Sequence, residues 1–203
     1  MEGLDVQEIK ELSNVELKSE IPQFVLNEVN EYAPSMEIQA EEIKDIFTEI
    51  PELRYENWKE LGADQRTEVL NSFEKRIAEI EMRDAMPVEH EATRPTLFGY
   101  YNGEKLVISD NLIGNDSYEA YKETLNTLFH EGRHAYQYYN LDVKRTEASW
   151  EMVNAWQVNL KELGYESAKS SLFSNRGYYR YYTQPIEVDA RTFAETVIGK
   201  LGV

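Results

Sequence analysis

The sequence contains no cysteine, only three histidines and no long hydrophobic run. The lack of cysteine excludes disulfide bonds and thiolate metal ligands. No apolar run approaches the roughly 20 residues that a membrane-spanning helix needs, and the first residues are acidic, whereas a signal peptide begins with basic residues. We therefore expect a soluble chain that does not act at a membrane. Its compartment is undetermined, and a cytoplasmic location is favoured.

Basic residues are also scarce, because 21 Lys and Arg stand against 38 Asp and Glu and give a net charge of −17. Such a chain repels a phosphate backbone, which argues against nucleic acid as a partner. The charge is uneven. Residues 1–91 contain 24 acidic and 9 basic residues, a net charge of −15, whereas residues 92–203 contain 14 and 12, a net charge of −2.

Apolar residues recur at helical spacing over residues 6–12, 22–32, 38–50 and 64–83, and this pattern stops near Met86 and Pro87. We therefore divide the chain into an acidic helical region, 1–86, and a second region, 87–203, on which the first packs or which it covers. The acidic helices either complete the fold with solvated faces, or present a surface to a protein partner or act as an inhibitory segment.

The most specific pattern is an H-E-x-x-H run formed by His130, Glu131, Gly132, Arg133 and His134. Residues four apart lie on the same face of a helix, so both imidazoles can reach one zinc ion (Zn²⁺). Glu131 would then face a water molecule bound to that ion and act as its general base. The alternative interpretation is a pair of exposed helix histidines that bind no metal.

The residues before this motif predict a hairpin and then a helix. Residues 98–109 have apolar and aromatic runs on both sides of Asn102 and Gly103, which is a strong hairpin signal. Asp116 and Ser117 offer a helix N-cap, and apolar residues continue at helical spacing through the motif. We expect a mostly helical α+β fold with a small sheet, and the motif in the middle of a helix.

A strand, a short loop and a helix with H-E-x-x-H resemble the zincin metallopeptidases. This resemblance covers about residues 97 to 200. It implies that the second region, 87–203, is a zincin-like domain with a bound zinc ion and a polypeptide substrate held beside the metal by an edge strand. We expect the substrate to pair with the strand at Leu106–Ser109.

The resemblance requires a third zinc ligand, and since no histidine follows His134 this ligand is expected to be a carboxylate. The run around Glu187 resembles the downstream helix of glutamate-zincins, and it is similar to the ImmA/IrrE-type peptidases of phages and mobile elements. Spacing alone cannot fix a ligand from another helix, so Asp189, Glu151 and Glu147 stay open as alternatives. Glu187 could instead be a first-turn acid that interacts with the helix dipole, and Asp189 could accept a hydrogen bond from a ligand histidine.

Residues 174–183 contain four tyrosines and two arginines directly before the proposed ligand helix. A tyrosine or arginine beside the metal would stabilise an oxyanion, and we take Tyr179 and Tyr182 as the candidates, with ordinary packing as the alternative. His90, in the connection between the two regions, is either a solvated loop histidine or a fourth zinc ligand of a latent form.

These features predict a zinc metallopeptidase in which His130, His134 and Glu187 hold the ion. Glu131 would take a proton from the zinc-bound water and deliver it to the leaving amine. Two other interpretations use the same residues. The chain could be a zincin-like interaction or structural protein of a phage or mobile element that cleaves nothing, or the toxic peptidase domain of a larger secreted effector.

Overall fold

The computed structural model describes residues 32–166 and 175–203. The helix predicted at residues 6–12, and nearly all of the one predicted at 22–32, lie outside the described residues. The chain divides into two compact units, Met1–Tyr32 and Ala33–Val203, and the second contains everything discussed below. The division that we predicted near Met86 and Pro87 falls inside this second unit.

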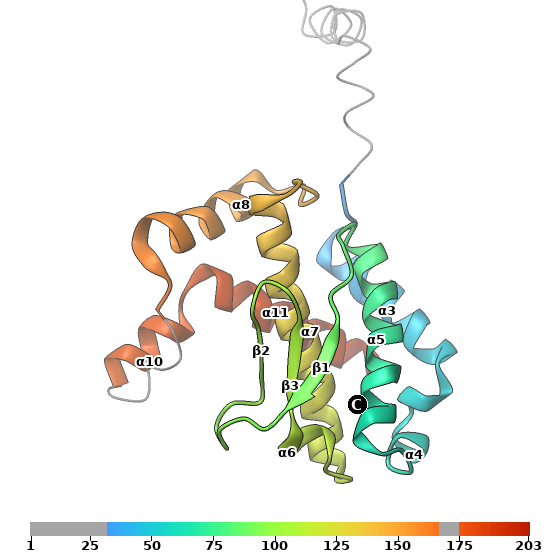
Figure 1. The fold of residues 1–203 in the computed structure, drawn as a ribbon. Helices are drawn as coiled ribbons and strands as arrows, with labels where there is room; N and C mark the ends of the chain where they lie inside the picture. The colour runs from blue at the N-terminus through green and yellow to red at the C-terminus, as the bar shows by residue number, and fades with distance from the viewer. Residues whose placement is uncertain (1–31, 167–174) are drawn as a thin grey trace, which may run out of the picture. The chain divides into compact units, whose positions relative to one another are not determined.

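Helices form most of the described chain (Figure 1). The prediction of a mostly helical α+β fold with a small sheet is confirmed, and the helices expected at 38–50 and 64–83 are present as α3 and α5. The helices are α3 (Met36–Glu49), α4 (Tyr55–Trp58), α5 (Ala63–Ile80), α6 (Asp110–Ile113), α7 (Tyr118–Asp142), α8 (Trp150–Gln157), α10 (Asn175–Tyr182) and α11 (Pro185–Leu201), with a 3-10 turn at Pro51–Leu53 and a π-helical segment at Val158–Gly164.

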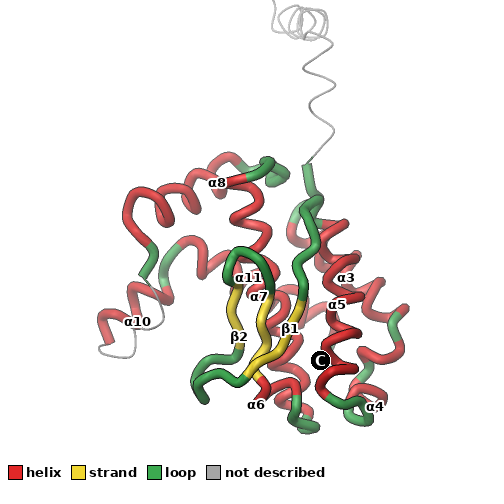
Figure 2. The backbone as a smooth tube through the Cα atoms, viewed as in Figure 1, coloured by secondary structure: helices red, strands yellow, loops and turns green. Residues whose placement is uncertain are grey.

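The sheet has the strand order β1-β3-β2 and lies over α7 in Figure 2. Strands β2 (Gly99–Tyr101) and β3 (Leu106–Ser109) pair antiparallel and form the predicted hairpin. Strand β1 (Val88–Glu91) pairs with β3 in parallel, although we expected a loop there. The backbone N–H of Val88 donates to Oδ1 of Asn71 at 2.8 Å, which fastens β1 to α5.

The position of β3 between two partners corrects the predicted substrate site. Both edges of Leu106–Ser109 are already hydrogen-bonded within the sheet, so an extended peptide cannot add to this strand. The free edges belong to β1 and β2. Of these, β2 packs against α7, the helix that carries the motif.

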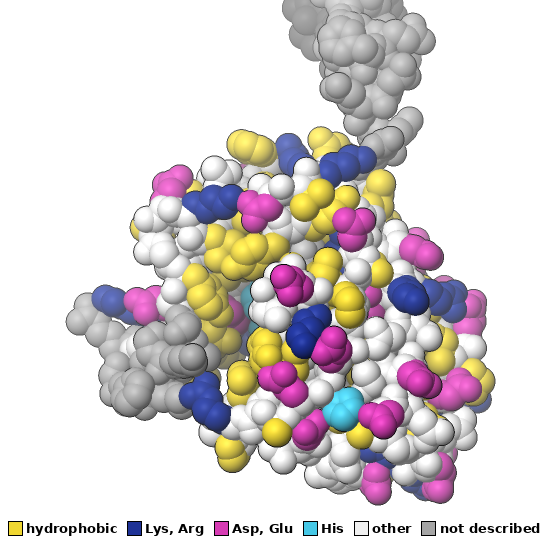
Figure 3. Space-filling view, in the orientation of Figure 1, with side chains coloured by type: hydrophobic (Ala, Val, Ile, Leu, Met, Phe, Trp, Pro, Cys, Tyr) yellow, Lys and Arg dark blue, Asp and Glu magenta, His cyan; other side chains and the backbone are white. Residues whose placement is uncertain are grey.

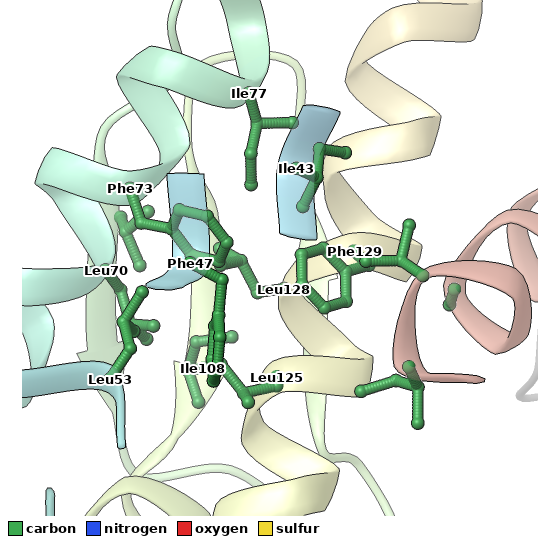
Figure 4. Packing of buried hydrophobic residues seen from close by; sticks show 14 of the residues in the cluster. Ile43, Phe47, Leu53, Leu70, Phe73, Ile77, Ile108, Leu125, Leu128 and Phe129 are labelled. Carbon is green, nitrogen blue, oxygen red and sulfur yellow. The ribbon is translucent and has the colours of Figure 1, made fainter. Parts of the chain in front are cut away.

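One hydrophobic core fills the space between the sheet and helices α3, α5, α7 and α11. Figure 4 shows Phe47, Phe73 and Phe129 among its residues, and the ring centroid of Phe73 lies 6.2 Å from that of Phe47 and 5.9 Å from that of Phe129. Phe47 and Phe73 precede Met86, whereas Phe129 follows it. Residues 33–86 therefore complete the same core as the motif helix.

Helix α7 begins where the sequence predicts, because Oγ of Ser117 accepts a hydrogen bond from the backbone N–H of Ala120 at 3.2 Å. Helix α11 begins with Pro185, which suits the first helical position, and ends at Gly202 in a left-handed conformation. The two helices pack closely against each other. Their contact places the first turn of α11 beside the middle of α7.

No helix in the described ranges has both the length and the hydrophobicity that crossing a membrane requires. On the face shown in Figure 3, acidic and basic side chains lie interspersed.

Candidate metal centre and active site

Three side chains from two helices converge at the contact between α7 and α11. His130 and His134 lie one helical turn apart on α7, and Glu187 lies in the first turn of α11. One ligand atom from each of the three residues lies within 4.8 Å of the others. The Nε2 atoms of His130 and His134 are each 3.4 Å from a different carboxylate oxygen of Glu187. The structure thus brings together the three ligands predicted from the sequence.

The donor set fits a zinc ion. Glu187 is fully buried, and its Oε2 atom has no hydrogen-bond partner in the described structure. Its contact with Nε2 of His130, at 3.4 Å, is too long for a good hydrogen bond, and a buried carboxylate oxygen without a hydrogen bond costs free energy. A divalent cation held by His130, His134 and Glu187 would use this oxygen as a ligand. Two imidazoles and one carboxylate are a common zinc set, and they leave a position open.

Glu187 and His134 shift each other's pKa. Burial disfavours the charged form of Glu187, but pairing with His130 and His134 and the hydrogen bond from Tyr165 outweigh it and lower the pKa of the carboxyl group. Burial likewise opposes protonation of His134, but the hydrogen bond with Glu187 and the charge of Glu131 outweigh it and raise its pKa to about 9. The site therefore attracts positive charge to the space between these side chains.

Gln137 fixes the orientation of His134. The Nε2 group of Gln137 donates to the carbonyl of Ile186 at 2.9 Å and to Oδ2 of Asp189 at 2.7 Å. Its Oε1 atom is thereby left facing Nδ1 of His134, at 2.8 Å. Because an amide oxygen only accepts, Nδ1 carries the hydrogen and Nε2 faces Glu187. This is the tautomer that a metal ligand needs.

Asp189 reaches His134 only through Gln137, which lies between them. Instead of accepting directly from a ligand histidine, its carboxylate binds Gln137 and the guanidinium of Arg133, with Nε of Arg133 2.9 Å from Oδ2. Neither of the other alternative ligands belongs to the group: Glu147 accepts from the hydroxyl of Tyr136, and Glu151 is exposed.

Glu131 lies beside the three ligands and faces the sheet. Its Oε2 atom accepts a hydrogen bond from the backbone N–H of Tyr101 at 2.9 Å. Tyr101 belongs to β2, one of the two edge strands of the described sheet, so the predicted general base lies between the candidate metal ligands and a sheet edge.

A cavity of about 520 Å³ opens over these residues. His130, His134, Glu187 and Glu131 all line it. The tyrosines Tyr101, Tyr165 and Tyr181 line it too. The other lining residues are Arg94, Leu97, Gly99, Tyr100, Tyr138 and Ile186.

Two tyrosines that we did not select reach the centre. The hydroxyl of Tyr165 donates to Oε1 of Glu187 at 2.7 Å, and Tyr181 also lines the cavity. Burial, and then the charge of Glu187, raise the pKa of both Tyr165 and Tyr181, so both hydroxyls stay protonated and can donate. No pattern in the sequence marks Tyr165.

Tyr179 and Tyr182, which we predicted beside the oxyanion, do not line this cavity. Tyr179 is 68% exposed, and Tyr182 stacks on Tyr178 with ring centroids 5.6 Å apart. Residues 175–182 form helix α10, and Tyr181 lies on the side of this helix that faces the cavity. Had we predicted a helix for this segment, the helical repeat would have placed Tyr181 on a different side from Tyr179 and Tyr182.

His90 takes neither of the predicted roles. It lies on β1, where Nδ1 is 2.6 Å from Oδ1 of Asp110 and Nε2 is 3.0 Å from Oδ1 of Asp64. The hydrogen bonds to these two carboxylates raise the pKa of His90. Both ring nitrogens are therefore engaged, and His90 is not among the three residues grouped as metal ligands in the described chain.

Comparisons with protein-family models, with curated proteins and with solved structures found no match for this chain.

Proposed function

We propose that this protein is a zinc-dependent metallopeptidase that resembles the zincins. One observation carries the proposal: His130, His134 and Glu187 converge around a buried carboxylate oxygen that has no hydrogen-bond partner in the described structure, with Glu131 beside them. A purely structural zinc site is closed by four protein ligands, whereas the described chain groups only three here. A base next to an open metal position is the arrangement that hydrolysis requires.

When bound, the zinc ion supplies a Lewis acid that polarises the scissile carbonyl group and acidifies the attacking water. Glu131 takes a proton from this water and delivers it to the amine that leaves. The hydroxyl group of Tyr181 donates toward the oxygen on which negative charge develops. The hydroxyl of Tyr165 donates to Glu187 and holds this carboxylate in place. Gln137 keeps His134 in the tautomer whose Nε2 faces the metal position.

We propose that the substrate is an extended polypeptide that pairs with the edge of β2. In the hairpin, Ser109 donates its N–H to the carbonyl of Phe98, and Asn102 donates its N–H to the carbonyl of Lys105. The residues between these pairs alternate in direction, so Gly99 and Tyr101 direct backbone groups away from β3. The N–H of Tyr101 donates to Glu131, which leaves the carbonyl of Tyr101 and the backbone groups of Gly99 for the peptide. This edge borders the cavity and runs beside Glu131.

Zinc content and hydrolysis, measured separately, test the proposal. We expect His134→Ala to abolish stoichiometric zinc binding. Glu131→Gln should keep the zinc and lower the rate of cleavage of a partly unfolded polypeptide by about 100-fold or more, because a general base contributes this much. A zinc chelator should stop the wild-type reaction, and added zinc should restore it. Loss of zinc from Glu131→Gln would show that the assigned roles are wrong.

Three carboxylate variants test the ligand set. Glu187→Ala should lower zinc affinity far more than Asp189→Ala, and Glu151→Ala should leave it unchanged, because Glu187 alone of the three lies in the ligand group. Full zinc occupancy without cleavage of any member of a broad peptide library would favour the interaction-protein alternative.

A further inference from the structure

A second cavity, of about 430 Å³, adjoins the metal centre along the same strand edge. It shares Gly99, His130 and Glu131 with the first cavity, so the two form one continuous groove. The second cavity extends past the Phe98 end of β2 toward α10 and α11. A peptide that pairs with β2 beside Glu131 would place neighbouring residues in it, since successive residues of a strand are about 3.3 Å apart.

Two arginines line this second cavity without a carboxylate partner in the described chain. Arg94 lines both cavities and is exposed, and none of the ion pairs among the described residues includes it. Arg191 donates through Nη2 to the carbonyl of Tyr182, and its guanidinium lies 3.7 Å from the centroid of the Tyr182 ring. These contacts hold the position of Arg191 and leave its charge uncompensated.

The chain has 38 acidic and 21 basic residues, and most basic side chains of the described part form an ion pair. Arg54, Lys75 and Lys122 also form no ion pair among the described residues, but they line neither cavity. Arg94 and Arg191 combine the lack of a carboxylate partner with a place in the groove. Seven basic side chains elsewhere on the described surface form ion pairs with an Asp or Glu: Lys44, Lys59, Arg76, Lys105, Lys161, Arg180 and Lys200. The mixture of acidic and basic side chains in Figure 3 agrees with this pattern.

The carboxylates that line the second cavity do not neutralise its arginines. Glu123 contacts the amide of Asn126 at 3.4 Å, and Glu131 accepts from the backbone of Tyr101. Neither forms an ion pair with Arg94 or Arg191 in the described chain. The guanidinium groups are therefore available to a carboxylate that enters the groove, and arginine binds carboxylates through two parallel hydrogen bonds.

We infer that the second cavity is a substrate subsite in which Arg94 and Arg191 bind a carboxylate group of the polypeptide. The carboxylate belongs either to an Asp or Glu side chain near the scissile bond or to the C-terminus of a short substrate. This inference rests on the proposed function, because the pairing of the peptide with β2 sets where the carboxylate lies.

The experiment uses short quenched-fluorescent peptides in matched pairs, with a single Glu or Gln moved through each position and with a free or an amidated C-terminus. At one position, or at the free C-terminus, we expect the wild-type enzyme to cleave the acidic member with about 10-fold higher kcat/KM, as expected for a charge-assisted hydrogen bond. The difference should arise mainly in KM, and it should shrink at high ionic strength because the arginines are close to solvent.

Arg94→Gln and Arg191→Gln should each remove most of this preference, while Arg191→Lys keeps part of it because the charge remains. The matched control is Arg54→Gln, which removes an exposed arginine outside both cavities and should keep the full preference. A preference that survives in both Arg94→Gln and Arg191→Gln would overturn the inference.

Failure of the subsite and failure of the proposed function are distinguishable. Equal cleavage of acidic and amide peptides by the wild type overturns the subsite and leaves the peptidase proposal intact. If no peptide is cleaved, binding of the same peptides to zinc-loaded Glu131→Gln is measured by fluorescence anisotropy. Acid-selective binding that Arg94→Gln and Arg191→Gln abolish supports the subsite, and binding without such selectivity overturns it.

Discussion

The side-chain oxygen of Gln137 lies 2.8 Å from Nδ1 of His134, on the side of the imidazole away from Glu187. Gln137 has no freedom to turn its amide, because its nitrogen already donates to Ile186 and Asp189. The second hydrogen bond of a metal-binding histidine sets its tautomer and its orientation. Here that bond comes from the same helix, one turn farther along.

The first prediction concerns Gln137→Leu. This variant keeps all three ligands but removes the acceptor at Nδ1 of His134. We expect the affinity for zinc to fall by about 10 to 100-fold, the usual effect of losing such a partner. A competition titration with a chromogenic chelator measures the affinity.

The control for this variant is Gln39→Leu, which removes another buried glutamine amide, on α3, that does not contact the three ligands. Both variants should lose stability, and only Gln137→Leu should lose zinc affinity. Equal zinc affinities for Gln137→Leu and the wild type would contradict the positioning role.

The second prediction separates the tyrosines. Tyr181→Phe should lower kcat by about 100-fold with zinc content unchanged, as expected for the loss of one oxyanion donor. Tyr179→Phe is the matched control, since its ring is 68% exposed and lies outside the cavity. Peptide cleavage by the two zinc-loaded variants gives the comparison. A larger loss of kcat for Tyr179→Phe than for Tyr181→Phe would support the oxyanion role that the sequence predicted for Tyr179.

The third prediction compares two glycines. A Cβ atom at Gly99 would lie 2.4 Å from the carbonyl oxygen of Val107 and 2.5 Å from Cγ2 of Thr127, so Gly99→Ala should destabilise the fold by about 1 to 3 kcal/mol. At Gly132 the nearest contacts are 3.5 Å to Arg83 and 4.0 Å to Leu106, which an alanine tolerates. Gly132→Ala should therefore stabilise the chain by up to about 1 kcal/mol, because alanine is the better helix former. Urea denaturation measures both changes, and the same sign for both would contradict the prediction.

The fourth prediction concerns His90 and pH. Its hydrogen bonds to Asp110 and Asp64 raise the pKa of the imidazole above its unfolded value. A raised pKa stabilises the fold below the unfolded value of about 6.5, and this contribution is lost as pH rises through the folded value. The free energy of unfolding of the wild type should exceed that of His90→Gln most clearly at pH 5 to 6, and the difference should shrink in alkaline solution.

Urea denaturation of both chains over this pH range tests the dependence. A difference that grows with rising pH would have the wrong sign for a protonated imidazole held between two acids.

The elements nearest the motif were predictable because they depend on neighbours in the chain. Asn102 and Gly103 specify a tight connection, Ser117 caps the next helix, and the helical repeat places His130 and His134 on one face. None of these requires knowledge of the rest of the fold. We did not predict strand β1. It has only four residues, with charged side chains at alternate positions, and such a short segment forms a strand only when β3 pairs with it.

The sequence by itself determined the motif helix and the hairpin before it, and the resemblance of these elements to zincins led us to expect a carboxylate from elsewhere. Only the tertiary structure decided which carboxylate reaches the histidines. Glu187 and Asp189 are two residues apart on one helix, and the packing of α11 against α7 turns Glu187 toward the histidines and Asp189 toward Arg133. The same packing brings Tyr165 to Glu187 and leaves Tyr179 in solvent. Spacing along a chain sets the face of each helix, but the rotation of one helix against another is set by the side chains that fill the space between them.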